Sequence, residues 1–192
     1  MRFKYLFVVL FSNIFSLSFF SQVSNLDLQL AKKYYLDNDY EKAVLYYEKI
    51  FKESEYRLKI YENYKSAFID LNKLKEAEKL SKILIKEHPK KLKFLVDLGV
   101  VYGLEDRADK KIQVFKKAIE QINKETSYDD AFDLGLAFEK IGNSEKALEV
   151  YLNFESKSFK NPFAFHSKIA LIYNKNGQTN EMINTFFEML DF

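Results

Sequence analysis

The side chains that most often do chemistry in proteins are sparse and widely spread in this sequence. It contains no cysteine, which excludes disulfides, thiolate metal sites and cysteine nucleophiles. Its two histidines, His88 and His166, stand far apart, and no histidine or carboxylate cluster has the spacing of metal ligands. The segment "GVVYG", residues 99–103, is too short for a phosphate-binding loop. We therefore expect no enzyme activity, no metal site and no cofactor.

Lysines are dense in residues 73–93, "KLKEAEKLSKILIKEHPKKLK", where eight lysines stand against three glutamates. Such a run can face an acidic partner, a phosphate or membrane headgroups, or it can form the solvated face of a helix. Beyond its first residues the chain holds two arginines, Arg57 and Arg107, whereas recognition of nucleic-acid bases relies on arginine. We expect a solvated face here and no nucleic-acid partner.

The composition predicts helices. Of 192 residues, 47% are hydrophobic and 30% charged, which is typical of a folded globular chain. Five glycines and two prolines are few, because strands joined by turns need more of both. Long helices with short connections fit better, so the expected fold class is all-α.

The first residues are typical of an export signal. Arg2 and Lys4 precede an apolar run through residue 20, and Ser21 supplies a small residue near a cleavage site. Ser16 and Ser18 offer another site, so the position of cleavage stays open. The alternative is a membrane anchor, but the run is short and Asn13 interrupts it.

From these features we expect a signal peptide over residues 1–21 and export to the periplasm or cell envelope. Because the chain has no cysteine, it has no lipobox for a lipid anchor. Removal of the signal leaves 28 basic and 28 acidic side chains and no expected membrane insertion.

A period of 34 to 36 residues runs through the rest of the chain, which indicates a repeat architecture. One column is aromatic throughout: Tyr34, Phe68, Tyr102, Phe138 and Tyr173. Three residues earlier stands a mostly small column: Ala31, Lys65, Gly99, Gly135 and Ala170. Four residues after the aromatic column stand residues that tolerate a left-handed backbone: Asn38, Asn72, Asp106, Gly142 and Gly177. The pattern predicts paired helices joined by tight turns.

These columns resemble the tetratricopeptide repeat (TPR) family of helix-turn-helix units. The segments that carry the resemblance are "AKKYYLDNDYEKAVLYYEKI" from Ala31, "LGLAFEKIGNSEKALEVY" from Leu134, and "YKSAFIDLNKLKEAEKLSKILIKEHP", which ends at Pro89. Lys65 and Lys111 depart from it, because they stand where small residues are usual. The resemblance implies a right-handed superhelical solenoid of about five units over residues 22–192, near 24–57, 58–91, 92–127, 128–162 and 163–192.

The family binds partners along a concave groove lined by the first helix of each hairpin. This implies a non-catalytic scaffold for a protein or peptide partner, with Tyr35 and Phe132 as the foremost candidates. The residues expected to line the groove are Leu28, Lys32, Tyr35, Leu36, Glu62, Ile69, Asp70, Val96, Val100, Phe132, Leu136 and Glu139. The alternative for the apolar members is closure of the solenoid on itself.

The aromatics near the start divide into two groups. The repeat predicts that Tyr34, Tyr40, Tyr47 and Phe51 are packing residues. A second function class, a carbohydrate or cell-wall binding module, would use aromatics outside the packing columns: Tyr35, Tyr46, Tyr61 and Phe132.

The last helix lacks a polar outer face, since Phe186, Met189 and Leu190 fall on one side of it. We expect either that the chain is the N-terminal interaction or regulatory segment of a larger exported protein or enzyme, or that this helix docks on a partner or a second copy.

Overall fold

The computed structural model describes residues 25–157 and 163–190, and all the regular secondary structure in these ranges is helical. The all-α class is therefore confirmed. The chain forms two compact units divided between Leu80 and Ser81, inside one helix. We call them unit 1 and unit 2. The expected signal peptide lies outside the described residues.

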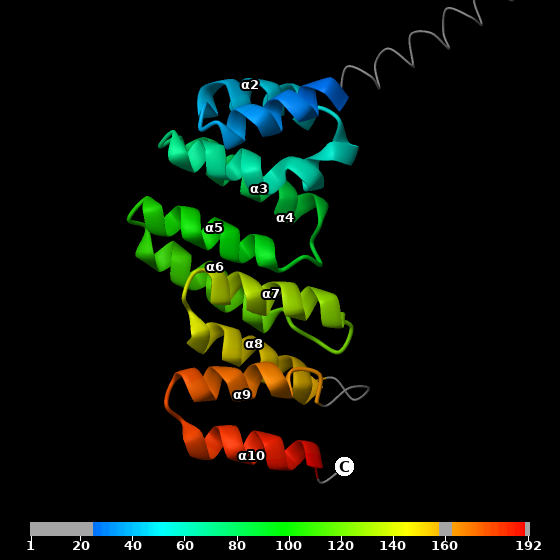
Figure 1. The fold of residues 1–192 in the computed structure, drawn as a ribbon, viewed down its shortest axis with the longest axis vertical. Helices are drawn as coiled ribbons and strands as arrows, with labels where there is room; N and C mark the ends of the chain where they lie inside the picture. The colour runs from blue at the N-terminus through cyan, green and yellow to red at the C-terminus, as the bar shows by residue number, and fades with distance from the viewer. Residues whose placement is uncertain (1–24, 158–162, 191–192) are drawn as a thin grey trace, which may run out of the picture. The chain divides into compact units, whose positions relative to one another are not determined.

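Unit 1 contains the N-terminal helices (Figure 1). Residues 25–36 are helical and are followed by α2 (Tyr40–Phe51), α3 (Ser54–Asp70) and the first half of α4 (Leu74–Glu87). Helices α2 and α3 pack against each other. Their shared core centres on Tyr47 and Tyr64, whose ring centroids are 5.6 Å apart, and Phe68 adjoins Tyr64 at 4.6 Å.

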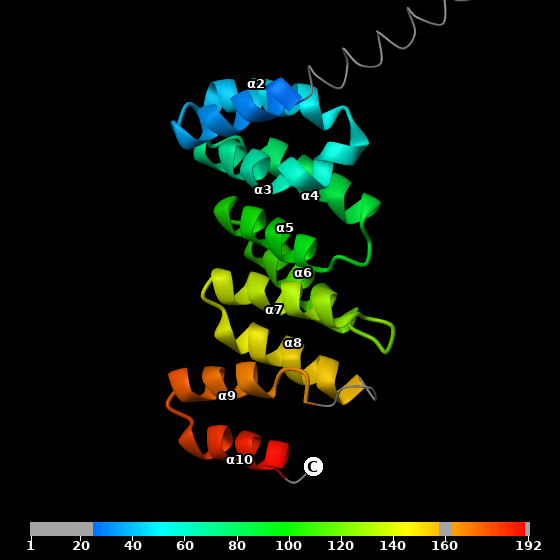
Figure 2. The same cartoon turned by 45° about the vertical axis from the view of Figure 1, so that its right-hand side comes forward.

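Unit 2 contains the remainder of α4 and three helical hairpins. Their helices are α5 (Lys93–Leu104), α6 (Ala108–Glu120), α7 (Tyr128–Lys140), α8 (Ser144–Lys157), α9 (His166–Lys175) and α10 (Thr179–Leu190). Contacts pair α5 with α6, α7 with α8 and α9 with α10, and further contacts join α5 to α7, α6 to α8 and α8 to α9. In Figures 1 and 2 alike, α9 lies between α8 and α10.

The turn column predicted from the sequence is confirmed at every position. Its members have positive φ: Asn38 at 59°, Asn72 at 55°, Asp106 at 57°, Gly142 at 74° and Gly177 at 73°. The residue after each donates its backbone N–H to the carbonyl of the aromatic column, as from Asp39 to Tyr34 at 2.9 Å. This is the Schellman arrangement that ends a helix at a left-handed residue.

The small column is confirmed by close packing in unit 2. A β-carbon on Gly99 would overlap the ring of Phe115, and one on Gly135 would overlap the ring of Tyr151. Lys65 occupies the same column in unit 1 and is nearly buried. Its Nζ donates to Glu62 at 3.1 Å and lies 4.8 Å from the ring centroid of Tyr61.

The predicted packing aromatics are buried to different degrees. Tyr47 is fully buried, whereas Tyr34, Tyr40 and Phe51 are only half-buried. Tyr34 stacks on Tyr46 with ring centroids 5.5 Å apart. Tyr47, by contrast, packs from α2 against Tyr64 of α3.

Candidate interaction surfaces

The groove residues predicted in unit 1 lie on two helices. Leu28, Lys32, Tyr35 and Leu36 belong to the helix through residue 36, and Glu62, Ile69 and Asp70 belong to α3. Lys32, Leu36, Glu62 and Asp70 are exposed, and the other three are partly exposed.

Tyr40 interacts with both groups of predicted groove residues in unit 1, those of the helix through residue 36 and those of α3. Its ring packs edge-on against Tyr35, with centroids 5.7 Å apart. Desolvation raises the pKa of Tyr40, and the negative charges of Asp70 and, to a smaller extent, Tyr35 raise it further. Tyr40 thus contacts Tyr35 directly and feels the charge of Asp70, which relates the two groups of predicted groove residues electrostatically.

Val96 is a correction among the predicted groove residues of unit 2. Its side chain is 1% exposed and belongs to the hydrophobic core of unit 2. The periodicity did place it on the same helical face as Val100, which is partly exposed. Val96 lies one turn before Val100 in α5 and is covered by the core of unit 2, so it cannot contact a ligand.

Phe132 is held in an aromatic cluster rather than standing free. Its ring is nearly parallel to those of Tyr128 and Phe165, with interplanar angles of 10° and 7°. The Nζ of Lys168 lies 5.5 Å from its centroid and 3.2 Å from the carboxylate of Glu139. Phe132 and Glu139, two predicted contacts on α7, thus share one cation from α9.

Glu139 also bonds to α8, the second helix of its hairpin. The hydroxyl of Tyr151 donates to its Oε1 at 2.6 Å. Burial raises the pKa of Tyr151, and the bond to Glu139 raises it further, because both favour the protonated phenol. Glu139 is therefore held in place from two sides.

A row of three apolar residues follows the small column in unit 2, one on each first helix. Val100, Leu136 and Leu171 each come directly after Gly99, Gly135 or Ala170, and we call them the apolar stripe. All are at least partly exposed, and Leu171 reaches 46%. Leu171 was not among the predicted groove residues, although the column register predicts it, because the last repeat fits the pattern loosely.

One end of the stripe adjoins a cavity of about 350 Å³. Val100, Leu104 and Ile141 contribute apolar side chains to its lining, and Lys111 contributes a cation. An apolar side chain next to an acidic group would suit this lining.

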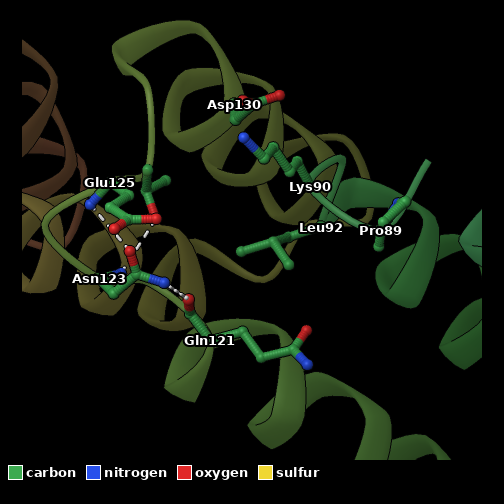
Figure 3. A pocket seen from close by; sticks show the side chains of 8 residues that line it. Pro89, Lys90, Leu92, Gln121, Asn123, Glu125 and Asp130 are labelled. Atoms are coloured by element: carbon green, nitrogen blue, oxygen red, sulfur yellow. Dashed lines mark hydrogen bonds between the residues drawn. The ribbon is translucent and has the colours of Figure 1, made fainter.

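A second cavity of about 240 Å³ lies at the opposite ends of these helices (Figure 3). It is lined by Pro89, Lys90, Leu92, Gln121, Asn123, Glu125, Thr126 and Asp130. Asn123 orders one wall, because its Oδ1 accepts from the backbone of Glu125 at 2.8 Å and its Nδ2 donates to Gln121 at 3.1 Å. The lining of this cavity carries charges of both signs, and none of the predicted site residues belongs to it.

A third cluster surrounds a histidine that the sequence analysis left without a role. His166 is buried at the start of α9, between Glu155 of α8 and Glu188 of α10. The two glutamates stand 11 and 22 residues away from it in the chain, so no linear motif marks the group.

Neither metal binding nor membrane crossing finds support in the described ranges. Across residues 25–157 and 163–190, no group of three or more His, Asp or Glu side chains is arranged to hold a metal ion. In the same part of the chain, no helix has the length and apolar character needed to cross a bilayer.

Left-handed turns at a fixed period, small residues under aromatic rings and hairpins packed in series define a TPR-like helical-repeat fold. No protein-family model and no curated protein matches the chain.

Solved structures of similar fold include MamA, at 19% identity over 89% of this chain and 92% of that one, with a TM-score of 0.46. Another MamA structure has 17% identity over 88% of this chain and 95% of that chain, with a TM-score of 0.41. TPR-like repeats of a kinesin light chain from Podospora anserina have 19% identity over 84% and 90% of the two chains, with a TM-score of 0.45. Each likeness concerns the fold alone.

Proposed function

We propose that this chain is a non-catalytic protein-interaction scaffold that binds a peptide or helix along the first helices of its hairpins. The observation that carries the proposal is the apolar stripe of Val100, Leu136 and Leu171. Three such side chains, each at least partly exposed on the first helices of successive hairpins, suit a partner with regularly spaced apolar residues. The ion pair of Glu139 and Lys168 borders the stripe and can orient polar groups of that partner.

A direct test uses selection from a random peptide library on the purified chain, followed by affinity measurements on the enriched peptides. We expect Leu136→Asp and Leu171→Asp to weaken binding at least tenfold, because a desolvated carboxylate would face the peptide. Ile112→Asp is the matched control, since Ile112 is 64% exposed on the second helix α6. Equal affinity for all three variants would remove the stripe from the site.

The proposed place of action is the periplasm or cell envelope. Support comes from the basic head, the apolar run and the small residues within residues 1–21. Cell fractionation with intact-mass analysis tests this proposal, since export requires a mature chain shortened by about the signal length. A full-length chain in the cytosolic fraction would contradict it.

We also propose that α10 supplies a docking or self-association surface. Its exposed apolar side chains are Ile183, Phe186, Phe187, Met189 and Leu190. The corresponding positions on α8 include Tyr151 and Phe154, which Phe165 covers with ring centroids 4.6 and 5.2 Å away. A helix that presents an aromatic side chain therefore suits this face of α10.

Sedimentation analysis over a range of concentrations tests the self-association. We expect Phe187→Glu to shift any oligomer to monomer, while Leu45→Glu, a control on α2 with a similarly exposed side chain, leaves it unchanged. A wild-type chain that stays monomeric and binds no apolar dye would exclude this surface.

A carbohydrate-binding role remains the second candidate function. One of its four predicted aromatics drops out, because Tyr61 is fully buried. Tyr128 is a better platform than any of the four, since it is 44% exposed and stacks on Phe165 at 15°. A glycan array that retains signal with wild type and loses it with Tyr128→Ala would favour this role over peptide binding.

The chain can also be the interaction or regulatory segment of a larger exported protein or enzyme. The coding sequence downstream of Phe192 tests this alternative, because an open frame that continues without a stop would place the scaffold in a longer chain.

A further inference from the structure

The imidazole of His166 joins three helices of unit 2. Its Nδ1 lies 3.0 Å from Oε1 of Glu155 on α8, and its Nε2 lies 3.2 Å from Oε2 of Glu188 on α10. His166 itself begins α9, which lies between those helices (Figures 1 and 2). Its side chain is only 7% exposed, so water replaces neither contact easily.

Both ring nitrogens can donate to these carboxylates only when the imidazole carries a second proton. A neutral ring has one N–H, and its other nitrogen presents a lone pair. Glu155 also accepts the backbone N–H of Phe165 at 2.6 Å, which fixes its carboxylate in place. The neutral ring therefore keeps its proton on Nδ1, facing Glu155, and turns a lone pair on Nε2 toward Glu188.

Among the described residues that line the cavity beside the ring, none carries a positive side chain other than His166 itself. A cavity of about 230 Å³ beside His166 is lined by Leu152 and Glu155 of α8, Ile169 and Tyr173 of α9, and Glu181, Asn184, Thr185 and Glu188 of α10. The ring of Phe163 packs edge-on against the imidazole, with centroids 4.7 Å apart. The charged groups that line the cavity with His166 are the three glutamates Glu155, Glu181 and Glu188.

The far half of α10 has little else to hold it. Thr185 is the buried residue of this helix, and side chains from Phe186 to Leu190 are exposed. An ion pair with a carboxylate as exposed as that of Glu188, at 67%, is ordinarily weak. Here it ties down a helix end with few apolar contacts, so its loss has a local effect.

We propose that His166 is a pH-sensitive latch that holds the far half of α10, residues 186–190, against α9. Uptake of a proton closes the latch through Glu155 and Glu188. Loss of that proton opens the contact with Glu188, because Nε2 then has no hydrogen to donate, so the attachment of α10 weakens as the pH rises. The latch goes beyond the scaffold role and does not depend on it.

Hydrogen exchange of the α10 amides tests the latch, after correction for the pH dependence of intrinsic exchange. We expect protection of residues 186–190 to fall several-fold between about pH 5.5 and about pH 7.5, and by no more than about tenfold per pH unit for one linked proton. Glu188→Gln removes one partner at an exposed position and should abolish this pH dependence. Glu181→Gln removes the same charge from the same helix without a bond to the ring, so the dependence should persist.

The protonation state can be read independently from the ¹⁵N shifts of the histidine side chains, with His88→Gln to assign the two rings. We expect both nitrogens of His166 to carry protons near about pH 5.5, and only Nδ1 to carry one at the higher pH. Protection of α10 that does not change with pH in the wild type, or that changes equally in Glu188→Gln, overturns the proposal.

Discussion

At the scale of single residues, the glycines of this chain serve two different needs. Gly99 and Gly135 stand in helices, where glycine is ordinarily unfavourable, because aromatic rings of the paired helix occupy the space of a β-carbon. Gly142 and Gly177 have open space around them and are needed for their positive φ. In the small column these glycines leave room for a ring that approaches the backbone closely, and in the turn column they allow a positive φ.

The first prediction compares Gly135→Ala with Gly142→Ala by urea denaturation. We expect the change at Gly135 to destabilise unit 2 by about 1–3 kcal/mol, since the ring of Tyr151 is anchored through Glu139 and cannot move aside. The change at Gly142 should cost about 1–2 kcal/mol for a left-handed alanine. If helix propensity alone decided the result, Gly135→Ala would instead stabilise by about 0.5–1 kcal/mol.

Tyr151→Phe isolates the hydrogen bond from the packing of the same ring. Phenylalanine fills the space beside Gly135 but leaves Glu139 without the phenol as a donor. We expect a loss of about 1.5–3 kcal/mol in the free energy of unfolding, as for a hydrogen bond to a charged group. Tyr128→Phe is the control, because Tyr128 is exposed at its ring. Equal midpoints for the two variants would show that Lys168 alone satisfies Glu139.

At the scale of elements, the sequence predicts what is local and fails where contacts are distant. The hairpin turns could be assigned residue by residue, because a left-handed backbone and its bond to the aromatic column involve six consecutive residues. Exposure on the first helices could not, since Val96 and Val100 share a face and differ only in what packs over them. The contacts of His166 with Glu155 and Glu188 join three helices, so no regular spacing in the sequence predicts them.

Substitutions at Asp106 test whether the turn depends on backbone conformation alone. We expect Asp106→Gly to stay within about 0.5 kcal/mol of the wild type or to stabilise it, because glycine adopts φ of 57° without strain. Asp106→Val should cost at least about 1–2 kcal/mol, since a β-branched residue resists this region. Thermal unfolding followed by circular dichroism measures both, and similar melting temperatures would mean that the side chain of Asp106 carries the turn.

At the scale of the whole chain, each compact unit keeps buried tyrosines in its core. Tyr47 and Tyr64 belong to unit 1, and Tyr151 belongs to unit 2. Burial is the main cause that raises the pKa of all three above the ordinary value of the phenol. Nearby acids add to this effect at Tyr64 and Tyr151, through the charges of Glu48 and Glu139.

The consequence is a chain that loses stability in alkali. The free phenol of an unfolded chain ionises near about pH 10, whereas these three phenols stay protonated in the folded state. Above that pH the folded state holds more protons than the unfolded one, so the free energy of unfolding falls as the pH rises, by up to about 1.4 kcal/mol per pH unit for each tyrosine. Below about pH 9 these tyrosines do not make the free energy of unfolding depend on pH, because they are protonated in both states.

Urea denaturation at a series of pH values from about 8 to about 11.5, together with tyrosinate absorbance, measures this slope. We expect Tyr64→Phe to flatten it by removing one linked proton from unit 1, and Tyr151→Phe to do the same for unit 2. In the wild type, part of the tyrosinate signal should appear only as helicity is lost, because the core phenols ionise on unfolding. Full ionisation of all tyrosines while the circular dichroism remains helical would mean that water reaches both cores.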